Sequence, residues 1–225
     1  MSIEPILQEL ESLGDAKMRM HHLKHGATGI IFGVKMGDIR KLAARLGIDH
    51  DRAINLWESG VMDARLLAIL TADPKRMSAA DLEHWVGTGD VDQVADWLQS
   101  YLVKGHPDKE MLRQAWMSET NPWLLRSAWA LTAGRIASNP EGLDINALLD
   151  LIDREFATVH KVTQWTMNTA LAYIGIHHPS LRTRAIAIAE HWGIYRDYPV
   201  SKGCTSPFAP IWIAEMVRRK HLTDK

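Results

Sequence analysis

Two aspartates one helical turn apart, Asp92 and Asp96, are the residues of this chain best spaced for chemistry. They lie in a segment whose apolar residues Val94 and Trp97 recur at helical spacing, so both carboxylates project from one helix, away from the centre of its apolar stripe. A fixed carboxylate can stabilise positive charge that develops in a transition state. The alternative is that both aspartates solvate a helix face or pair with Arg or Lys.

A later segment contributes Arg126, which points away from the apolar stripe of its own predicted helix. A guanidinium can hold a phosphate through two parallel hydrogen bonds. Equally, Arg126 can form an internal ion pair with Asp92 or Asp96. The residue type therefore fits either a phosphate contact or a structural tie.

The chain has nine tryptophans against three phenylalanines, an unusual aromatic balance. Most should be packing residues, because an indole buries a large apolar area. Trp97 and Trp165 are the candidates for a binding role, since either ring could stack on a ligand and hold a cation with about 0.5–2 kcal/mol of cation–π attraction. Ordinary core packing is the competing interpretation for both, and Trp97 lies on the apolar stripe.

Positive charge is concentrated near the start of the chain. Residues 15–45 hold seven Lys and Arg against two Asp, whereas residues 46–100 hold four against ten Asp and Glu. The net charge of −1 gives no global signature of nucleic-acid binding, but charge position matters more than the sum. We expect attraction to phosphate groups, or a solvated basic face, from six cations: Lys17, Arg19, Lys24, Lys35, Arg40 and Lys41.

Several classes of protein are disfavoured by composition. Cys204 is the only cysteine, so an intrachain disulfide is impossible and a reducing, cytoplasmic compartment is the simplest assumption. The N-terminus lacks the pattern of a signal peptide, and no apolar stretch is long enough to span a membrane. Cys204 with His177, His178 and His191 fits no closed zinc pattern, so we expect no metal and no cofactor.

Apolar periodicity and turn residues predict helices throughout, with no strand alternation. The loose period of about 30 to 40 residues between alternate helices is typical of helix pairs that must stack to bury their apolar faces. The predicted fold is all-α, one curved α-solenoid domain over residues 1–225, with a globular helical bundle as the alternative. The helices are expected at residues 3–13, 15–25, 38–47, 50–59, 62–72, 79–86, 144–156, 161–176, 179–192 and 211–220, with three more between 90 and 136. Ser78 and Asp144 are the expected N-caps of two of them.

A resemblance to one known family rests on residues 22–24, 33–34, 40–42, 92–96, 106–107, 121–128 and 200–213. These segments resemble the AlkD-like DNA alkylation repair glycosylases, which are built from HEAT-like helical repeats. The resemblance implies excision of cationic N3- or N7-alkylpurines from double-stranded DNA by a monomer, with Trp97 and Trp165 as candidates to stack on a deoxyribose or a cationic base. It also implies contact through the sugar and backbone, without insertion of the base into a pocket.

The family's catalytic pattern is a tryptophan, an aspartate, two residues and the essential aspartate, followed by an arginine and a further tryptophan from later helices. Here Val91 stands where the first tryptophan would be. Alignment on Asp92 places the essential position on Ala95, and a shift of one residue places it on Asp96. We therefore expect Asp96 to be the key carboxylate, with Asp92 as the alternative.

The rest of the pattern matches later in the chain. Arg126 corresponds to the family arginine, and the last tryptophan's place falls near residues 168–169, one turn after Trp165. Two rival functions remain: a DNA-binding relative that has lost the chemistry, and a protein-interaction solenoid with no role at nucleic acid.

Overall fold

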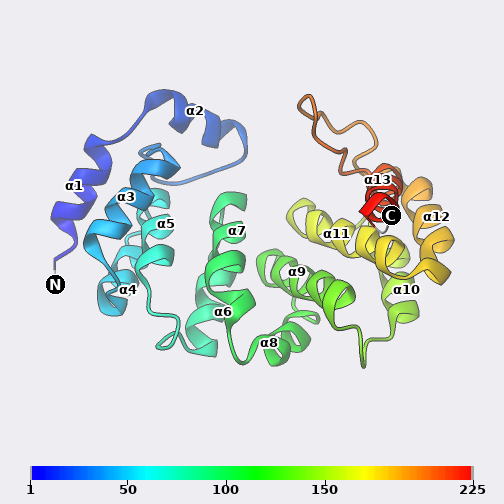
Figure 1. Cartoon of the computed structure of the whole chain (residues 1–225). Helices are drawn as coiled ribbons and strands as arrows, with labels where there is room; N and C mark the ends of the chain where they lie inside the picture. Colours follow the sequence, from blue (N-terminus) through cyan, green and yellow to red (C-terminus); the bar gives the residue numbers. More distant parts are fainter. Residues whose placement is uncertain (1, 224–225) are drawn as a thin grey trace. The chain divides into compact units, whose positions relative to one another are not determined.

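The computed structural model describes residues 2–223, and its regular secondary structure is helical (Figure 1). The described part of the chain contains thirteen α-helices and two short 3-10 helices. Its only strand-like pairings are two isolated bridges, Gly14 with Val34 and Ile30 with Val61. No helix within the described range is long and apolar enough to cross a membrane. The predicted all-α class is confirmed.

The chain divides into two compact units, one ending at Leu112 and the other starting at Arg113. The single domain expected from the sequence stays a prediction. Unit 1 contains α1 (Glu4–Ser12), α2 (Ala16–Lys24), α3 (Met36–Leu46), α4 (His50–Glu58), α5 (Met62–Thr71), α6 (Ala79–Gly87) and α7 (Asp92–Tyr101), with a 3-10 turn at Val103–Gly105. The helix α8 (Lys109–Trp116) spans the division, and unit 2 contains α9 (Pro122–Ser138), α10 (Ile145–Glu155), α11 (Lys161–His177), α12 (Arg182–Trp192) and α13 (Ala209–Thr223).

Local sequence explains most helix ends. Ser78 caps α6 in a capping box with Asp81, and Asp144 caps α10 by accepting from the backbone N–H of Ala147. Both caps were predicted and are confirmed. The start predicted for α12 at Pro179 is wrong, because residues 179–181 form a 3-10 turn and α12 begins at Arg182. This turn lets the Arg182 guanidinium donate to the carbonyl oxygen of Gly175 at 2.7 Å, near the end of α11.

The core of unit 1 is built around tryptophan. The rings of Trp57 and Trp85 stack with centroids 4.4 Å apart and planes 4° from parallel, and both side chains are fully buried. The Arg65 guanidinium lies over the outer face of Trp57, 5.0 Å from its centroid, and pairs with Asp90 at 3.2 Å. Packing thus accounts for much of the tryptophan excess, as the composition suggested.

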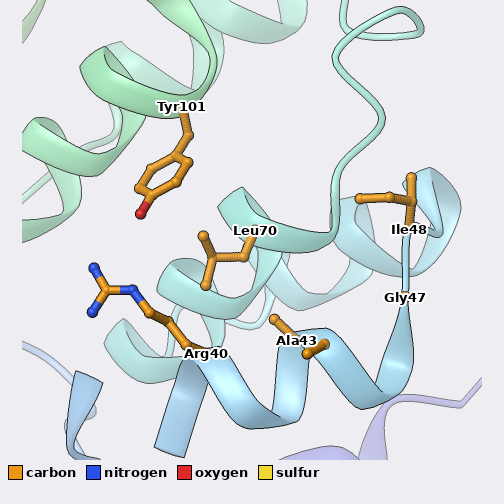
Figure 2. A pocket seen from close by; sticks show the side chains of 7 residues that line it. Arg40, Ala43, Gly47, Ile48, Leu70 and Tyr101 are labelled. Carbon is orange, nitrogen blue, oxygen red and sulfur yellow. The ribbon is translucent and has the colours of Figure 1, made fainter. Parts of the chain in front are cut away.

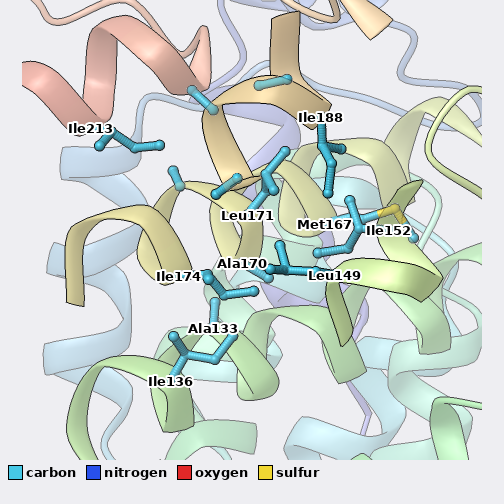
Figure 3. Close-up of a cluster of buried hydrophobic side chains, with 14 of the residues drawn as sticks. Ala133, Ile136, Leu149, Ile152, Met167, Ala170, Leu171, Ile174, Ile188 and Ile213 are labelled. Atoms are coloured by element: carbon cyan, nitrogen blue, oxygen red, sulfur yellow. The ribbon is translucent and has the colours of Figure 1, made fainter. Parts of the chain in front are cut away.

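The core of unit 2 is aliphatic and centres on the long helices α9 and α11 (Figure 3). Gly175 lets α13 approach α11 closely, because a Cβ at this position would lie 2.4 Å from Cδ1 of Ile213. The labelled side chains of the cluster are Ala133, Ile136, Leu149, Ile152, Met167, Ala170, Leu171, Ile174, Ile188 and Ile213.

Candidate nucleic-acid interface

A buried carboxylate positions the segment that follows the basic helix α2. Asp63, on α5, is 1% exposed and accepts hydrogen bonds from the backbone N–H groups of Phe32 and Val34, both at 2.7 Å, and more weakly from Gly33 at 3.4 Å. A carboxylate with several N–H donors satisfies backbone groups that burial would otherwise leave unpaired. Asp63 therefore anchors residues 32–34 to the core of unit 1.

The same segment holds α2 in place through Gly33. Its carbonyl oxygen accepts from the backbone N–H of Asp15, the N-cap of α2, at 3.2 Å. Gly33 has a φ of +82°, and a Cβ here would lie 2.5 Å from the backbone nitrogen of Arg19. Only glycine allows this approach with this backbone conformation. Asp63 and Gly33 together fix the helix that carries three of the predicted cations.

The six predicted cations are all exposed, and only some of them form an ion pair with a carboxylate. Lys35 pairs with Asp15 at 3.4 Å, and Lys41 pairs with Asp38 at 2.9 Å. The others have no carboxylate partner among the described residues, so their charge is available to a ligand. These unpaired cations are Lys17, Arg19, Lys24 and Arg40.

Arg40 is held by an aromatic ring. Its guanidinium carbon lies 4.8 Å from the ring centroid of Trp97 on α7, and Trp97 in turn lies 5.6 Å from the ring of Tyr101, one turn further on. Cation–π contact of this kind is worth about 0.5–2 kcal/mol. Arg40 is therefore an oriented cation in addition to being an unpaired one.

Arg40 and Tyr101 border a shallow pocket of about 400 Å³ between α3, α5 and α7 (Figure 2). Figure 2 shows the Arg40 guanidinium and the Tyr101 hydroxyl pointing toward the same space, with Leu70 beside them. The remaining lining residues are small or aliphatic: Ala43, Ala44, Gly47 and Ile48. The pocket has an apolar wall and a positively charged edge.

Asp92 and Asp96 are exposed on α7, one turn apart, as the sequence predicted. The next residue, Trp97, is 6% exposed and packs between Arg40 and the core. Stacking of Trp97 on a sugar or base stays a prediction, and it would require Arg40 to move from the ring. The two aspartates, unlike Trp97, are exposed.

Arg126 lies in unit 2, where α9 buries it to 4% exposure. Its Nη1 donates to the carbonyl oxygen of Val162 in the first turn of α11, at 2.8 Å. Nearby, the Thr163 hydroxyl donates to the carbonyl oxygen of Pro122 at 2.9 Å. Arg126 thus ties α9 to α11, and its predicted phosphate contact stays a prediction that would require the guanidinium to turn outward.

Trp165 differs from the other tryptophans. It is 37% exposed on α11, whereas the remaining eight, all within the described range, are buried or half-buried. Its ring contacts Tyr195 and Tyr198 from the segment that precedes α13. Sequence reasoning singled out Trp165 but missed both tyrosines, because the partners are thirty or more residues away along the chain.

A buried histidine lies beneath the basic helix. His22 of α2 is 7% exposed, and burial lowers the pKa of its imidazole below the ordinary value. The neighbouring His21 and His25 also lower this pKa, and the Asp63 carboxylate opposes them. The side chain is therefore neutral at pH 7, and it adds no positive charge to the cations of α2.

These observations define a helical-repeat protein with four exposed cations that have no carboxylate partner on α2 and α3 of its first unit. The chain belongs to the family described as DNA alkylation repair enzymes, whose model matches residues 6–202. The fold is that of a solved structure from "a new family of proteins related to the HEAT-like repeat DNA glycosylases with affinity for branched DNA structures". That structure superposes with a TM-score of 0.73 at 21% identity, over 100% of this chain and 95% of its own.

Two bacterial relatives match over nearly their whole length. "Uncharacterized protein Lin0241" of Listeria innocua is 24% identical over 220 residues, which cover 95% of each chain. "Uncharacterized protein Lmo0209" of Listeria monocytogenes is 23% identical with the same coverage. The family resemblance drawn from the sequence is confirmed.

Proposed function

We propose that this protein binds double-stranded DNA through the cations of α2 and α3 and excises cationic alkylpurines from it. The observation that carries the binding is the set of four exposed cations without carboxylate partners, Lys17, Arg19, Lys24 and Arg40. Cations that contact phosphates release condensed counterions, which gives sequence-independent and salt-dependent affinity. Membership of the DNA alkylation repair family supports DNA as the polyanion.

Arg40 is the cation best suited to a specific phosphate. Stacking on Trp97 limits its rotamers, so less side-chain entropy is lost when the guanidinium binds. Its planar donors match two phosphate oxygens. Asp96 precedes Trp97 on α7, so the proposed carboxylate belongs to the same helix as the ring that orients Arg40.

The proposed chemistry needs one carboxylate near the sugar. Alkylation at N3 or N7 leaves positive charge on the purine and weakens its bond to C1′. That bond breaks with its electron pair going to the base, which leaves as a neutral molecule while positive charge develops on the sugar. The Asp96 carboxylate stabilises this charge, and water adds to C1′ and loses a proton to give an abasic site.

Asp92 and Asp96 provide a matched pair for the test, because both are exposed on the same helix. Release of 7-methylguanine from methylated duplex DNA is measured under single-turnover conditions. Asp96→Asn should lower the rate by about 100- to 1,000-fold, the usual cost of losing one transition-state contact. Asp92→Asn should stay within a few-fold of wild type. An unchanged rate in Asp96→Asn would exclude this residue as the carboxylate.

A second function is favoured by the departures of this chain from the catalytic pattern. Val91 occupies the tryptophan position, and Arg126 is engaged inside unit 2. A protein with these features can bind DNA without cleaving a glycosidic bond, and the solved relative is described as having affinity for branched DNA. Salt-sensitive DNA binding by wild type without any base release would support this function. No DNA binding even at low salt would leave a protein-interaction role.

A further inference from the structure

An aromatic cluster lies at the surface of unit 2 and consists of Trp165 on α11 with Tyr195 and Tyr198 from the segment between α12 and α13. The three rings contact one another in pairs, with centroid distances of 5.3 Å between Trp165 and Tyr195 and 5.7 Å for the other two pairs. Trp165 is 37% exposed and Tyr198 is 45% exposed. The cluster is therefore assembled but not buried.

The segment that carries the tyrosines is attached to the core at its far end. The amide of Asn168, 2% exposed on α11, donates to the carbonyl oxygen of Pro207 at 2.8 Å. The Arg196 guanidinium lies 4.8 Å from the ring centroid of the buried Phe208 and also pairs with Glu190 at 2.7 Å. These contacts determine where the segment leaves and rejoins the helices.

Tyr195 adopts a left-handed backbone conformation with a φ of +63°, the only such non-glycine residue in the described range. This conformation is unfavourable for any residue that has a Cβ atom, and a bulky aromatic residue is uncommon there. In exchange the turn brings both tyrosine rings to Trp165, and the Tyr198 N–H donates to the Tyr195 carbonyl oxygen at 3.2 Å. The rings are thus brought together by a backbone conformation that glycine would adopt more easily.

Positive charge flanks the cluster. Lys161 lies one turn before Trp165 on the same face of α11, and Lys202 follows Tyr198 on the same segment. Both are exposed, and neither has a carboxylate partner among the residues that the structure describes. Asp197, between the tyrosines, offsets part of this charge. The surface therefore combines partly exposed aromatic side chains with a modest positive field.

We propose that the aromatic cluster binds an unpaired base of DNA by stacking, while Lys161 and Lys202 attract the adjacent phosphates. Every base presents a π-face, so stacking on aromatic side chains tolerates any sequence. A paired base inside a duplex hides both faces against its neighbours, so the cluster selects DNA with unpaired bases. This inference rests on the proposed function, because it takes DNA as the ligand, but it assigns the unpaired base to a surface of unit 2 alone.

The test compares a fully paired duplex with the same duplex carrying an unpaired bulge, by fluorescence anisotropy at one salt concentration. Wild type should bind the bulged DNA more tightly. Trp165→Ala and Tyr198→Ala should each weaken binding of the bulged DNA by about 5- to 100-fold, the range for loss of one base–aromatic stack. Both variants should bind the paired duplex within about 2-fold of wild type.

Two control variants separate stacking from loss of structure or of general apolar surface. Tyr198→Phe keeps the ring and should retain the preference for bulged DNA. Ile211→Ala removes a side chain that is 50% exposed on α13, outside the cluster, and should leave both affinities unchanged. Far-UV circular dichroism of each variant verifies that the helices remain folded.

Each other outcome overturns the inference in a recognisable way. Equal binding of both DNAs by wild type would remove the unpaired-base site while leaving the proposed function intact. If Trp165→Ala weakened binding of the paired and the bulged DNA equally, the cluster would contact DNA without selecting unpaired bases. A concentration-dependent dimer that Tyr198→Ala dissociates would assign the cluster to self-association. No DNA binding of any kind would overturn the proposed function as well.

Discussion

Each unit uses one buried polar side chain to anchor the segment that carries its candidate binding surface, and the two anchors differ in kind. In unit 1, the Asp63 carboxylate accepts from three consecutive backbone N–H groups beneath α2. In unit 2, the Asn168 amide donates once, to Pro207, and its Oδ1 has no hydrogen-bond partner among the described residues. The Asp63 carboxylate satisfies the N–H groups of three consecutive residues, whereas the Asn168 amide holds its segment at one carbonyl oxygen.

The candidate binding surfaces of the two units also differ in kind. Helices α2 and α3 carry the unpaired cations on regular backbone, which suits the evenly spaced phosphates of a duplex. The aromatic cluster carries rings on an irregular segment, which suits a single base away from its stack. The comparison indicates that a rigid anchor accompanies the charged surface and a minimal anchor accompanies the aromatic one.

The largest effect should follow from loss of the charged anchor. Asp63→Ala leaves up to three backbone N–H groups buried without an acceptor, so we expect the free energy of unfolding to fall by about 3 kcal/mol or more. Urea denaturation followed by circular dichroism measures the change. Asp38→Ala, which removes an exposed ion pair with Lys41, should change stability by less than about 1 kcal/mol. Similar losses in both variants would remove the distinction between anchor and surface pair.

Gly33→Ala should have the next largest effect, about 2 kcal/mol of destabilisation, because it combines a φ of +82° with a contact of 2.5 Å to the backbone of Arg19. Gly37→Ala is the matched control, since Gly37 lies within α3 and a Cβ there meets no atom within 4 Å. We expect that control to stabilise the protein by about 0.5–1 kcal/mol. Changes of the same sign would show that Gly33 does not hold α2.

Loss of the second anchor should cost less. Asn168→Ala removes one donated hydrogen bond and leaves the Pro207 carbonyl near solvent, so we expect about 1–2 kcal/mol. Limited proteolysis of residues 194–208 should accelerate in this variant. Thr169→Ala, which only removes a bond to the carbonyl of Trp165 in its own helix, should leave cleavage unchanged. A cost equal to that of Asp63→Ala would contradict the comparison.

The smallest effect concerns His22, under the basic helix. Its pKa is lowered in the folded protein, so below an ordinary pKa of about 6.5 the unfolded chain binds more protons than the folded one. The free energy of unfolding should therefore fall as pH drops through this range. His22→Gln should reduce the slope of stability against pH, which urea denaturation at a series of pH values measures. An unchanged slope in His22→Gln would assign the pH dependence elsewhere.

Local patterns in the sequence predicted the helices and several of their caps, because helix periodicity and capping act over a few residues. The anchors could not be predicted in this way. Asp63 binds backbone atoms about thirty residues away, and Arg40 meets Trp97 only after α3, α5 and α7 have packed. Burial of Arg126 likewise depends on the pairing of α9 with α11. The left-handed turn at Tyr195 could not be predicted either, because tyrosine rarely adopts this backbone conformation.

The salt dependence of duplex binding tests the central claim most directly, because each cation that contacts a phosphate contributes about 0.9 to the slope of log affinity against log salt. One variant replaces with alanine the unpaired cations Lys17, Arg19, Lys24 and Arg40. A control with the same change in net charge replaces Lys75, Arg76, Lys104 and Lys109, which are exposed elsewhere in unit 1.

We predict that the first variant loses most of its affinity for duplex DNA and shows a slope shallower by about 2 to 4, while the control stays close to the slope of wild type. Equal slopes in the two variants would show that overall charge, rather than the four cations of α2 and α3, attracts the DNA. That result would contradict the claim that these cations of unit 1 bind the phosphate backbone.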